Sequence, residues 1–146
     1  GIFVMKKVGV FYWSGSGNTE KMAEAIGAGL AAAGVEYDVV NISSDSKNVA
    51  DYEKLMFGCP SMGAEQLEEA EFEPFFDEAE KSISGKDVAL FGSYGWGDGE
   101  WMRNWVERVE GSGASVFNDE GLIINETPDD DGIAECEKFA KEFAAC

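Results

Sequence analysis

Short apolar runs alternate with segments of helical periodicity along almost the whole chain. In residues 20–30, apolar or small side chains recur at three- and four-residue spacing, which predicts an amphipathic helix that packs on a sheet. Helices are also expected over 72–83, 100–109 and 133–145, and one short helical turn over 49–52. The runs that predict strands are 7–12, 37–42, 54–59 and 87–91, followed by a fifth strand shared between 115–117 and 122–124.

Strands that alternate with helices form βαβ units and therefore a parallel sheet. We predict a doubly wound three-layer α/β sandwich, in which a five-stranded parallel sheet has the strand order 2-1-3-4-5. Since no repeat, linker or low-complexity tract interrupts the pattern, residues 5–146 are expected to form one domain. Ligands of such sheets bind beyond the carboxyl ends of the strands, where the strand order changes direction. The loops expected there are 14–18, 60–65 and 93–99.

Composition and charge exclude several classes of function. The net charge of −18 repels nucleic acid and anionic membrane surfaces, and it attracts basic partners. The absence of histidine removes the commonest general base and metal ligand. Cys59, Cys136 and Cys146 are far apart in sequence, which favours free thiols in a reducing compartment. Without an apolar run of membrane-spanning length, a cytoplasmic protein is expected, with Gly1–Val4 as an extension added ahead of a natural start at Met5.

The sequence Ser14-Gly15-Ser16-Gly17-Asn18-Thr19 joins the first strand to the first helix. It lacks the lysine of a Walker loop, and Glu20 stands where a dinucleotide fingerprint needs its third glycine. What remains is a set of hydroxyl groups and backbone N–H groups at the start of a helix. Such neutral donors can hold a terminal phosphate. We therefore interpret this loop as a phosphate site.

The other two loops offer groups for a flat ligand. Trp96 stands between two glycines, so it has no bulky neighbours and is suited to stacking on a ring. Met62 is a polarizable side chain that can lie against a ring, and Gly63-Ala64 suits the centre of a type II′ turn. Glu65 follows as an acceptor for a ring N–H.

These three motifs, in this order and on these elements, resemble the flavodoxins, specifically the short-chain kind of anaerobic bacteria. The resemblance covers the chain from Met5 onward. It implies bound FMN, with the phosphate at residues 14–19, the isoalloxazine ring between Met62 and Trp96, and Glu65 accepting from the flavin N3–H. The full set of cofactor-binding residues that it implies is Ser14, Gly15, Ser16, Gly17, Asn18, Thr19, Pro60, Ser61, Met62, Gly63, Ala64, Glu65, Ser93, Tyr94, Gly95, Trp96, Gly97 and Asn125.

The resemblance further implies a low-potential carrier of single electrons between redox enzymes. A flip of the Gly63–Ala64 peptide would direct a carbonyl group at the reduced flavin, while the acidic side chains of residues 65–69, 98 and 100 would disfavour the second electron. The same acidic side chains are expected to attract basic docking surfaces of ferredoxin-dependent oxidoreductases and of flavodoxin or ferredoxin reductases. A monomer that binds neither nucleic acid nor membrane is expected.

Two other functions share this topology. An FMN-dependent NAD(P)H:quinone or nitro reductase needs a second substrate pocket, often built by insertions that this chain lacks, and it remains the alternative. A phospho-receiver domain needs acidic residues after its first strand, an aspartate after its third and a lysine after its fifth. Because Trp13-Ser14, Gly58-Cys59 and Asn125 stand there instead, that function is rejected.

Overall fold

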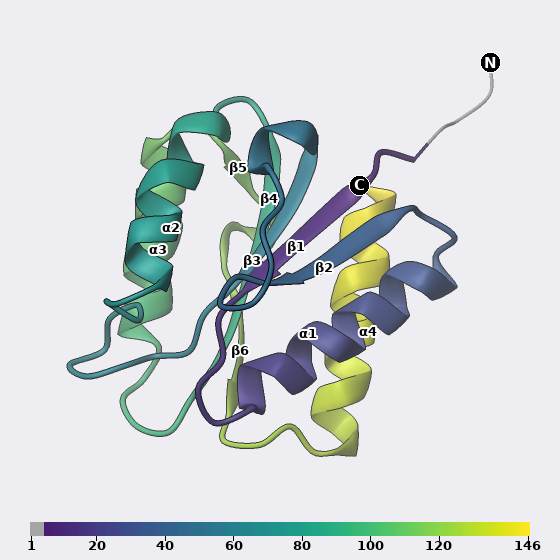
Figure 1. Cartoon of the computed structure of the whole chain (residues 1–146). Helices are drawn as coiled ribbons and strands as arrows, with labels where there is room; N and C mark the ends of the chain where they lie inside the picture. The colour runs from purple at the N-terminus through teal and green to yellow at the C-terminus, as the bar shows by residue number, and fades with distance from the viewer. Residues whose placement is uncertain (1–4) are drawn as a thin grey trace.

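The computed structural model describes residues 5–146, so the expectation that residues 1–4 are an added extension lies outside the described residues. Its elements alternate as the sequence pattern indicates (Figure 1). In chain order they are β1 (Val8–Tyr12), α1 (Asn18–Ala32), β2 (Tyr37–Asn41), η1 (Val49–Asp51), β3 (Lys54–Gly58), α2 (Phe72–Ala79), η2 (Glu80–Ser82), β4 (Asp87–Tyr94), α3 (Glu100–Gly111), β5 (Ser115–Val116), η3 (Phe117–Asp119), β6 (Leu122–Asn125) and α4 (Asp130–Ala145).

The sheet is parallel and has the predicted order, β2-β1-β3-β4-β5, with β6 also paired to β4. The predicted interruption of the fifth strand is confirmed, because β5 pairs with the start of β4 and β6 with its end. Between them, the single turn η3 contains Asn118 and Asp119 at positive φ, a backbone region that suits Asn and Asp better than most residues. The two short strands therefore act as one edge of the sheet.

Two element boundaries differ from the sequence prediction. β4 does not end at Phe91 but continues to Tyr94, because Gly92 allows the backbone to pass close to the neighbouring strand end. A Cβ atom on Gly92 would lie 2.2 Å from the Cys59 carbonyl oxygen. α4 begins at Asp130 rather than Ile133, since the Asp129 side chain caps the helix by accepting a hydrogen bond from Gly132 N at 2.8 Å.

Helices cover both faces of the sheet, with α1 and α4 on one face and α2 and α3 on the other (Figure 1). Both faces bury aliphatic and aromatic side chains, and the α2–α3 face contains the larger group of aromatic residues, which includes both buried tryptophans. There, Phe72 and Phe76 stack on each other and meet Trp105 edge to face. Within residues 5–146, no helix has the length and apolar character needed to cross a membrane.

Two cationic side chains tie the helices into these layers. Lys54, only 3% exposed, donates from Nζ to the carbonyl oxygens of Phe143 and Cys146, both at 2.7 Å, and so satisfies the carboxyl end of α4. Arg108 on α3 donates to Glu73, Asp77 and Glu80 on the neighbouring α2 segment. Lys54 thus ties α4 to β3, and Arg108 ties α3 to the α2 segment.

Candidate functional site

The three loops predicted to carry the site come together around one cavity. It has a volume of about 560 Å³ and lies beyond the carboxyl ends of β1, β3 and β4. Its lining residues are Gly15, Ser16, Asn18, Pro60, Ser61, Met62, Ser93, Tyr94, Gly95, Trp96 and Glu126. Ten of these eleven belong to the set predicted from the sequence, and the topology alone explains why residues so distant in the chain meet there.

The first loop presents a row of open backbone donors. The N–H groups of residues 15–19 have no acceptor within the described part of the chain, and the first backbone bond of α1 runs from Lys21 N to Gly17 O at 3.1 Å. Gly17 makes this possible with φ of +99°, a conformation that glycine adopts without steric cost. Ser14 Oγ accepts from Glu20 N at 3.1 Å, which leaves its own hydrogen free to donate. This end of the cavity can hold an anion without any basic side chain.

Thr19 and Ser93 join the first loop to the end of β4. Their hydroxyl oxygens lie 2.8 Å apart in a buried contact, and Thr19 Oγ1 also accepts from Ser93 N at 3.3 Å. Thr19 does not line the cavity, and its hydroxyl group bonds to Ser93 instead. Thr19 therefore positions the loop.

Ser61 gives a direct indication of a polar ligand. The residue is only 5% exposed and lines the cavity, yet its Oγ has no hydrogen-bond partner among the described residues. A buried hydroxyl group without a partner costs about 1–3 kcal/mol, so such groups usually serve a ligand or a water molecule. An unpaired donor beside the anion-binding loop fits the phosphate or sugar part of FMN.

The middle loop forms a tight hairpin. Met62 and Gln66 exchange two backbone hydrogen bonds, at 2.8 and 2.9 Å, and thereby enclose Gly63, Ala64 and Glu65. The hydrogen-bonded loop therefore has three residues, one more than the Gly63-Ala64 centre expected from the sequence. The positive φ expected at its first position is present, with Gly63 at +53°. A second positive φ, +50° at Glu65, supplies the extra bend.

Two apolar side chains of these loops are exposed at the cavity, Met62 at 36% and Trp96 at 58%. Exposed aromatic and thioether groups at a cavity are suited to covering the two faces of a planar ring. The Trp96 indole N–H donates to the Gly63 carbonyl oxygen at 3.2 Å, so the tips of the middle and third loops are in direct contact. Trp101, by contrast, is buried and donates to the Cys59 carbonyl oxygen, as expected for a packing residue.

Glu65 has a structural role that the sequence did not reveal. Its Oε1 accepts from Gly99 N at 3.2 Å and from Glu100 N at 3.1 Å, at the start of α3. A carboxylate at this end of a helix is stabilised by the open N–H groups and by the helix dipole. Gly97 leaves the space for it, because a Cβ atom there would lie 2.3 Å from the Glu65 carboxyl carbon.

Fewer of the acidic side chains of residues 65–69, 98 and 100 are available for docking than predicted. Glu68 is 8% exposed and accepts three backbone N–H bonds at the start of α2, so it cannot take part in docking. Burial opposes its charged form, but the donors from Phe72, Glu71 and Ala70 prevail and lower the pKa of Glu68. The acidic charge beside the third loop is partly compensated, since Arg103 on α3 donates to the Asp98 carbonyl oxygen and carboxylate at 3.0 and 2.9 Å.

Sequence reasoning missed Glu126. This residue follows β6, lines the cavity and has φ of +62°, while its N–H donates to the Tyr94 carbonyl oxygen at 2.8 Å. Its place at the carboxyl end of β6 was the available signal. Asn125, which was predicted, lies beside it but does not line the cavity; its side-chain amide donates to the same carbonyl oxygen at 3.3 Å. The other predicted residues that do not line the cavity are Ser14, Gly17, Gly63, Ala64, Glu65 and Gly97.

The three thiols are free, as predicted. Cys59 is fully buried at the end of β3, and burial raises the pKa of its thiol far above the ordinary value. Burial likewise raises the pKa of Cys136, on α4, to about 12. Both are packing residues, and neither can form a thiolate at neutral pH.

The fold and the cavity define a doubly wound α/β protein that binds a flat ligand carrying a phosphate group at one end. Comparisons with known proteins identify the class further. The family model described as Flavodoxin matches residues 10–139. The chain is 46% identical to a flavodoxin of Clostridium beijerinckii, with 92% of this chain and 97% of the relative covered, and 44% identical to that of Megasphaera elsdenii, with 94% and 98% covered.

Solved structures agree with the sequence comparisons. The solution structure of two-electron reduced Megasphaera elsdenii flavodoxin superposes with a TM-score of 0.84 at 43% identity and covers 95% of this chain. A flavodoxin from the domain Archaea gives 0.85 at 31% identity. The chain belongs to the flavodoxin family. Its cofactor is therefore FMN, its function is electron transfer, and the reductase alternative is not favoured.

Proposed function

We propose that this protein is a low-potential carrier of single electrons that has no catalytic activity of its own. FMN supplies the chemistry, because it takes up and releases electrons one at a time. The protein supplies the binding site, through the cavity that joins the open N–H groups of residues 15–19 to Met62 and Trp96. That single cavity, with anion donors at one end and exposed faces for a ring at the other, carries the proposal. A single FMN-binding domain, residues 5–146, is sufficient for it.

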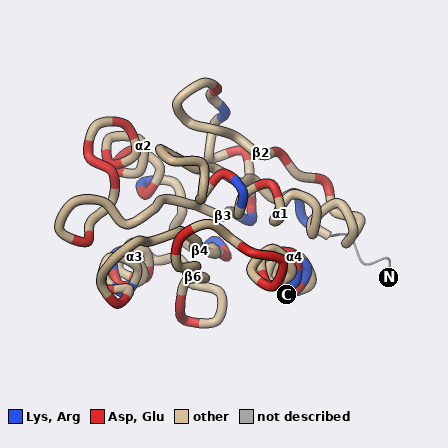
Figure 2. The backbone as a smooth tube through the Cα atoms, turned by 90° about the horizontal axis from the view of Figure 1, so that it is seen from below, with Lys and Arg blue, Asp and Glu red and all other residues tan. Residues whose placement is uncertain are grey.

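We further propose that the local charge keeps the potential of the second electron low. Glu126 lines the cavity, and the carboxylate of Glu65, on the middle loop, accepts hydrogen bonds at the start of α3. Arg103, beside the third loop, is engaged by Asp98, and the exposed Lys21 lies in the first turn of α1. A negative charge added to the cofactor would therefore be repelled more than it is attracted. The same excess charge would guide basic redox partners to this side of the molecule, where acidic positions predominate on the loops (Figure 2).

FMN binding through the phosphate is the first test. The cofactor is removed, and the apoprotein is titrated with FMN and with riboflavin while flavin fluorescence is followed. FMN should bind far more tightly than riboflavin. Replacing Ser16 by Ala should weaken FMN binding, whereas Ser115→Ala, at an exposed position remote from the cavity, should not. Equal affinities for FMN and riboflavin would refute the phosphate site.

The carrier function is tested with the FMN-loaded protein. Reduction by dithionite under potential control should give a second-electron potential below that of free FMN. Purified protein should not oxidise NADH or NADPH, and steady turnover of either would support the reductase alternative. Electron transfer to a basic acceptor protein should slow as salt is added, because salt screens the attraction. A rate that is independent of salt would contradict docking by charge.

A further inference from the structure

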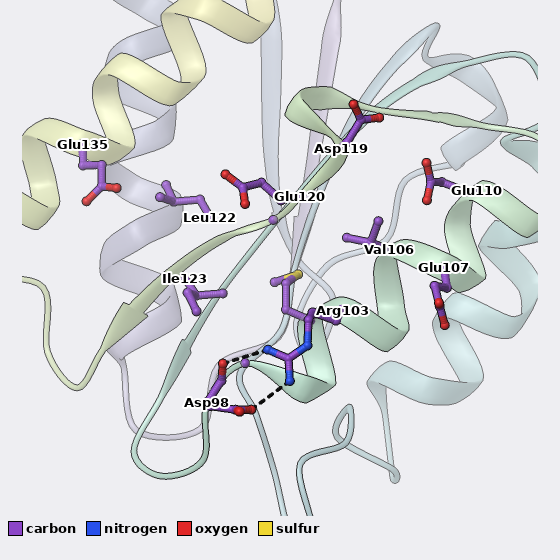
Figure 3. A pocket seen from close by; sticks show the side chains of 13 residues that line it. Asp98, Arg103, Val106, Glu107, Glu110, Asp119, Glu120, Leu122, Ile123 and Glu135 are labelled. Carbon is purple, nitrogen blue, oxygen red and sulfur yellow. Dashed lines mark hydrogen bonds and ion pairs between the residues drawn. The ribbon is translucent and has the colours of Figure 1, made fainter.

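A trough crosses the β6 edge of the sheet, between α3 and α4. It consists of a cavity of about 560 Å³ on the α3 side and a second of about 200 Å³ on the α4 side. The two share Glu120, Gly121, Leu122 and Glu135, so they run into each other over β6. Figure 2 shows α3 and α4 on either side of this edge, and Figure 3 shows the larger cavity. We call this feature the edge trough; apart from Asp98, Gly99 and Ile123, its lining lies away from the flavin loops.

The floor of the edge trough is apolar. Met102 and Val106 on α3 are 3% and 7% exposed, and Leu122 and Ile123 on β6 are half-buried. Gly121 brings the backbone close to this floor, since a Cβ atom there would lie 2.2 Å from Met102 Sδ. Figure 3 shows Val106, Leu122 and Ile123 with charged side chains around them. A small apolar group could therefore be buried between α3 and β6.

The wall formed by β6 has free backbone hydrogen-bonding groups. β6 pairs with β4 on one side only, and within residues 5–146 no strand or backbone hydrogen bond occupies its other side. Alternate N–H and C=O groups of an edge strand point outward, where they can pair with a further strand. An extended peptide that adds to such an edge gains backbone hydrogen bonds, and its alternate side chains enter the neighbouring pocket.

The charges around the trough indicate what kind of partner could bind there. Its exposed acidic side chains are Glu107 and Glu110 on α3, Asp119 and Glu120 beside β6, and Glu135 on α4 (Figure 3). On the α4 side the lining also includes Glu142 and the exposed Lys138, whose charged groups lie 3.9 Å apart. Arg103 is already engaged by Asp98, so carboxylates outnumber cations around the trough. A second copy of this chain, itself at −18, would bring a like-charged edge against these carboxylates. A lysine- or arginine-rich segment would complement them, so the charges favour a basic partner over self-association.

We propose that the edge trough binds an extended, basic segment of a redox partner, which adds to β6 as a strand. Apolar side chains of the segment would enter the floor while its basic side chains meet the acidic walls. Because the trough reaches Asp98 and Gly99, it ends beside the third flavin loop, and a partner held there would have its body close to Trp96. Only the nature of the partner rests on the proposed carrier function; the binding of the segment does not.

The experiment uses the full-length, FMN-loaded protein and a fluorescent heptapeptide of alternating lysine and valine, with binding followed by fluorescence anisotropy. Two further peptides carry N-methyl groups on every other amide, in either register, which keeps the charge but blocks strand addition. The test variant combines Glu107→Lys and Glu120→Lys, and the control combines Glu24→Lys and Glu36→Lys on exposed positions far from the trough. Each substitution replaces a negative by a positive charge and so raises the net charge by two, which brings both double variants from −18 to −14.

Strand addition predicts that the test variant binds the peptide about tenfold more weakly, that the control variant changes affinity less than about twofold, and that at least one methylated peptide loses about tenfold. Equal weakening of the two variants, or equal binding of all three peptides, would overturn the proposal in favour of general charge attraction. The FMN absorbance spectrum of each variant reports the flavin site separately. A protein that fails to bind FMN but still binds the peptide would refute the proposed function, while the proposal for the edge trough would stand.

Discussion

Glu68 is predicted to stabilise the fold rather than to attract partners. Its Oε1 accepts from Glu71 N and Phe72 N, both at 2.8 Å, and its Oε2 accepts from Ala70 N at 2.9 Å. In Glu68→Gln, one oxygen can still serve the first two donors, but the amide NH₂ then faces Ala70 N–H. One bond to a charged acceptor is lost and two become neutral bonds of about half the strength, so we expect a loss of about 2–4 kcal/mol.

The contribution of Glu68 to the free energy of unfolding depends on pH, because only its ionised form accepts these bonds. The pKa of Glu68 lies below its ordinary value of 4.5 in the folded protein, so its stabilising effect is fully present above that ordinary value. As the pH falls below it, the unfolded chain takes up the proton first, and the effect is lost by about 1.4 kcal/mol per pH unit until the folded pKa is reached. The difference between the parent protein and Glu68→Gln should therefore shrink in acid, while all other groups cancel.

Urea unfolding at pH 7 and at several acidic pH values measures that difference. The matched control is Glu69→Gln, which removes the same charge from the exposed neighbouring residue and should change the free energy of unfolding by less than about 0.5 kcal/mol. If Glu69→Gln destabilises the protein as much as Glu68→Gln does, the loss of stability comes from the change in net charge and not from the hydrogen bonds of Glu68. If the difference does not change with pH, the carboxylate bonds at the start of α2 are not its source.

Three further changes test other parts of the structure. Ser61→Ala should stabilise the apoprotein slightly but weaken FMN binding about fivefold in a fluorescence titration, because the buried hydroxyl group gains a partner only from the cofactor; unchanged affinity would contradict this. Lys54→Met should lower the free energy of unfolding by about 2–3 kcal/mol in urea, whereas the exposed Lys138→Met should have almost no effect. Gly63→Val should strain a backbone at φ of +53° and lower the first-electron potential by about 40 mV or more in a redox titration, if the Gly63 carbonyl serves the reduced cofactor.

The sheet and the cavity were predictable because they depend on local patterns that tertiary packing reinforces. The five residues of β3 form a continuous apolar segment apart from Lys54, as expected for a strand covered on both faces. Gly17 marks the turn into α1, and its φ of +99° shows why glycine is needed there. Once the order of parallel strands is known, the loops at their carboxyl ends must meet, and the positions of Met62 and Trp96 follow.

The acidic residues were harder to place, because the function of a carboxylate depends on which donors surround it in three dimensions. In sequence, Glu65, Glu68 and Glu69 look alike. In the structure, Glu65 accepts hydrogen bonds at the start of α3 and Glu68 accepts them at the start of α2, whereas Glu69 is exposed. Glu126 was overlooked for the related reason that its backbone bend, not its residue type, brings it to the cavity. Nothing in a single sequence reports such long-range pairing.

The arrangement around Glu65 bears on how the flavin loops can move. Its Oε1 is engaged by the start of α3, which leaves Oε2 available for the flavin N3–H that the family resemblance implies. The carboxylate would thus be positioned by the helix before the cofactor arrives. Arg103 fixes Asp98 on the third loop, at the point where the edge trough begins. A segment bound in the trough would therefore contact the part of the third loop that Arg103 holds, whereas Gly63 and Ala64 lie exposed at the tip of the middle loop, where the Gly63 carbonyl accepts from Trp96. Docking and adjustment of the cofactor would in this way use different parts of one site.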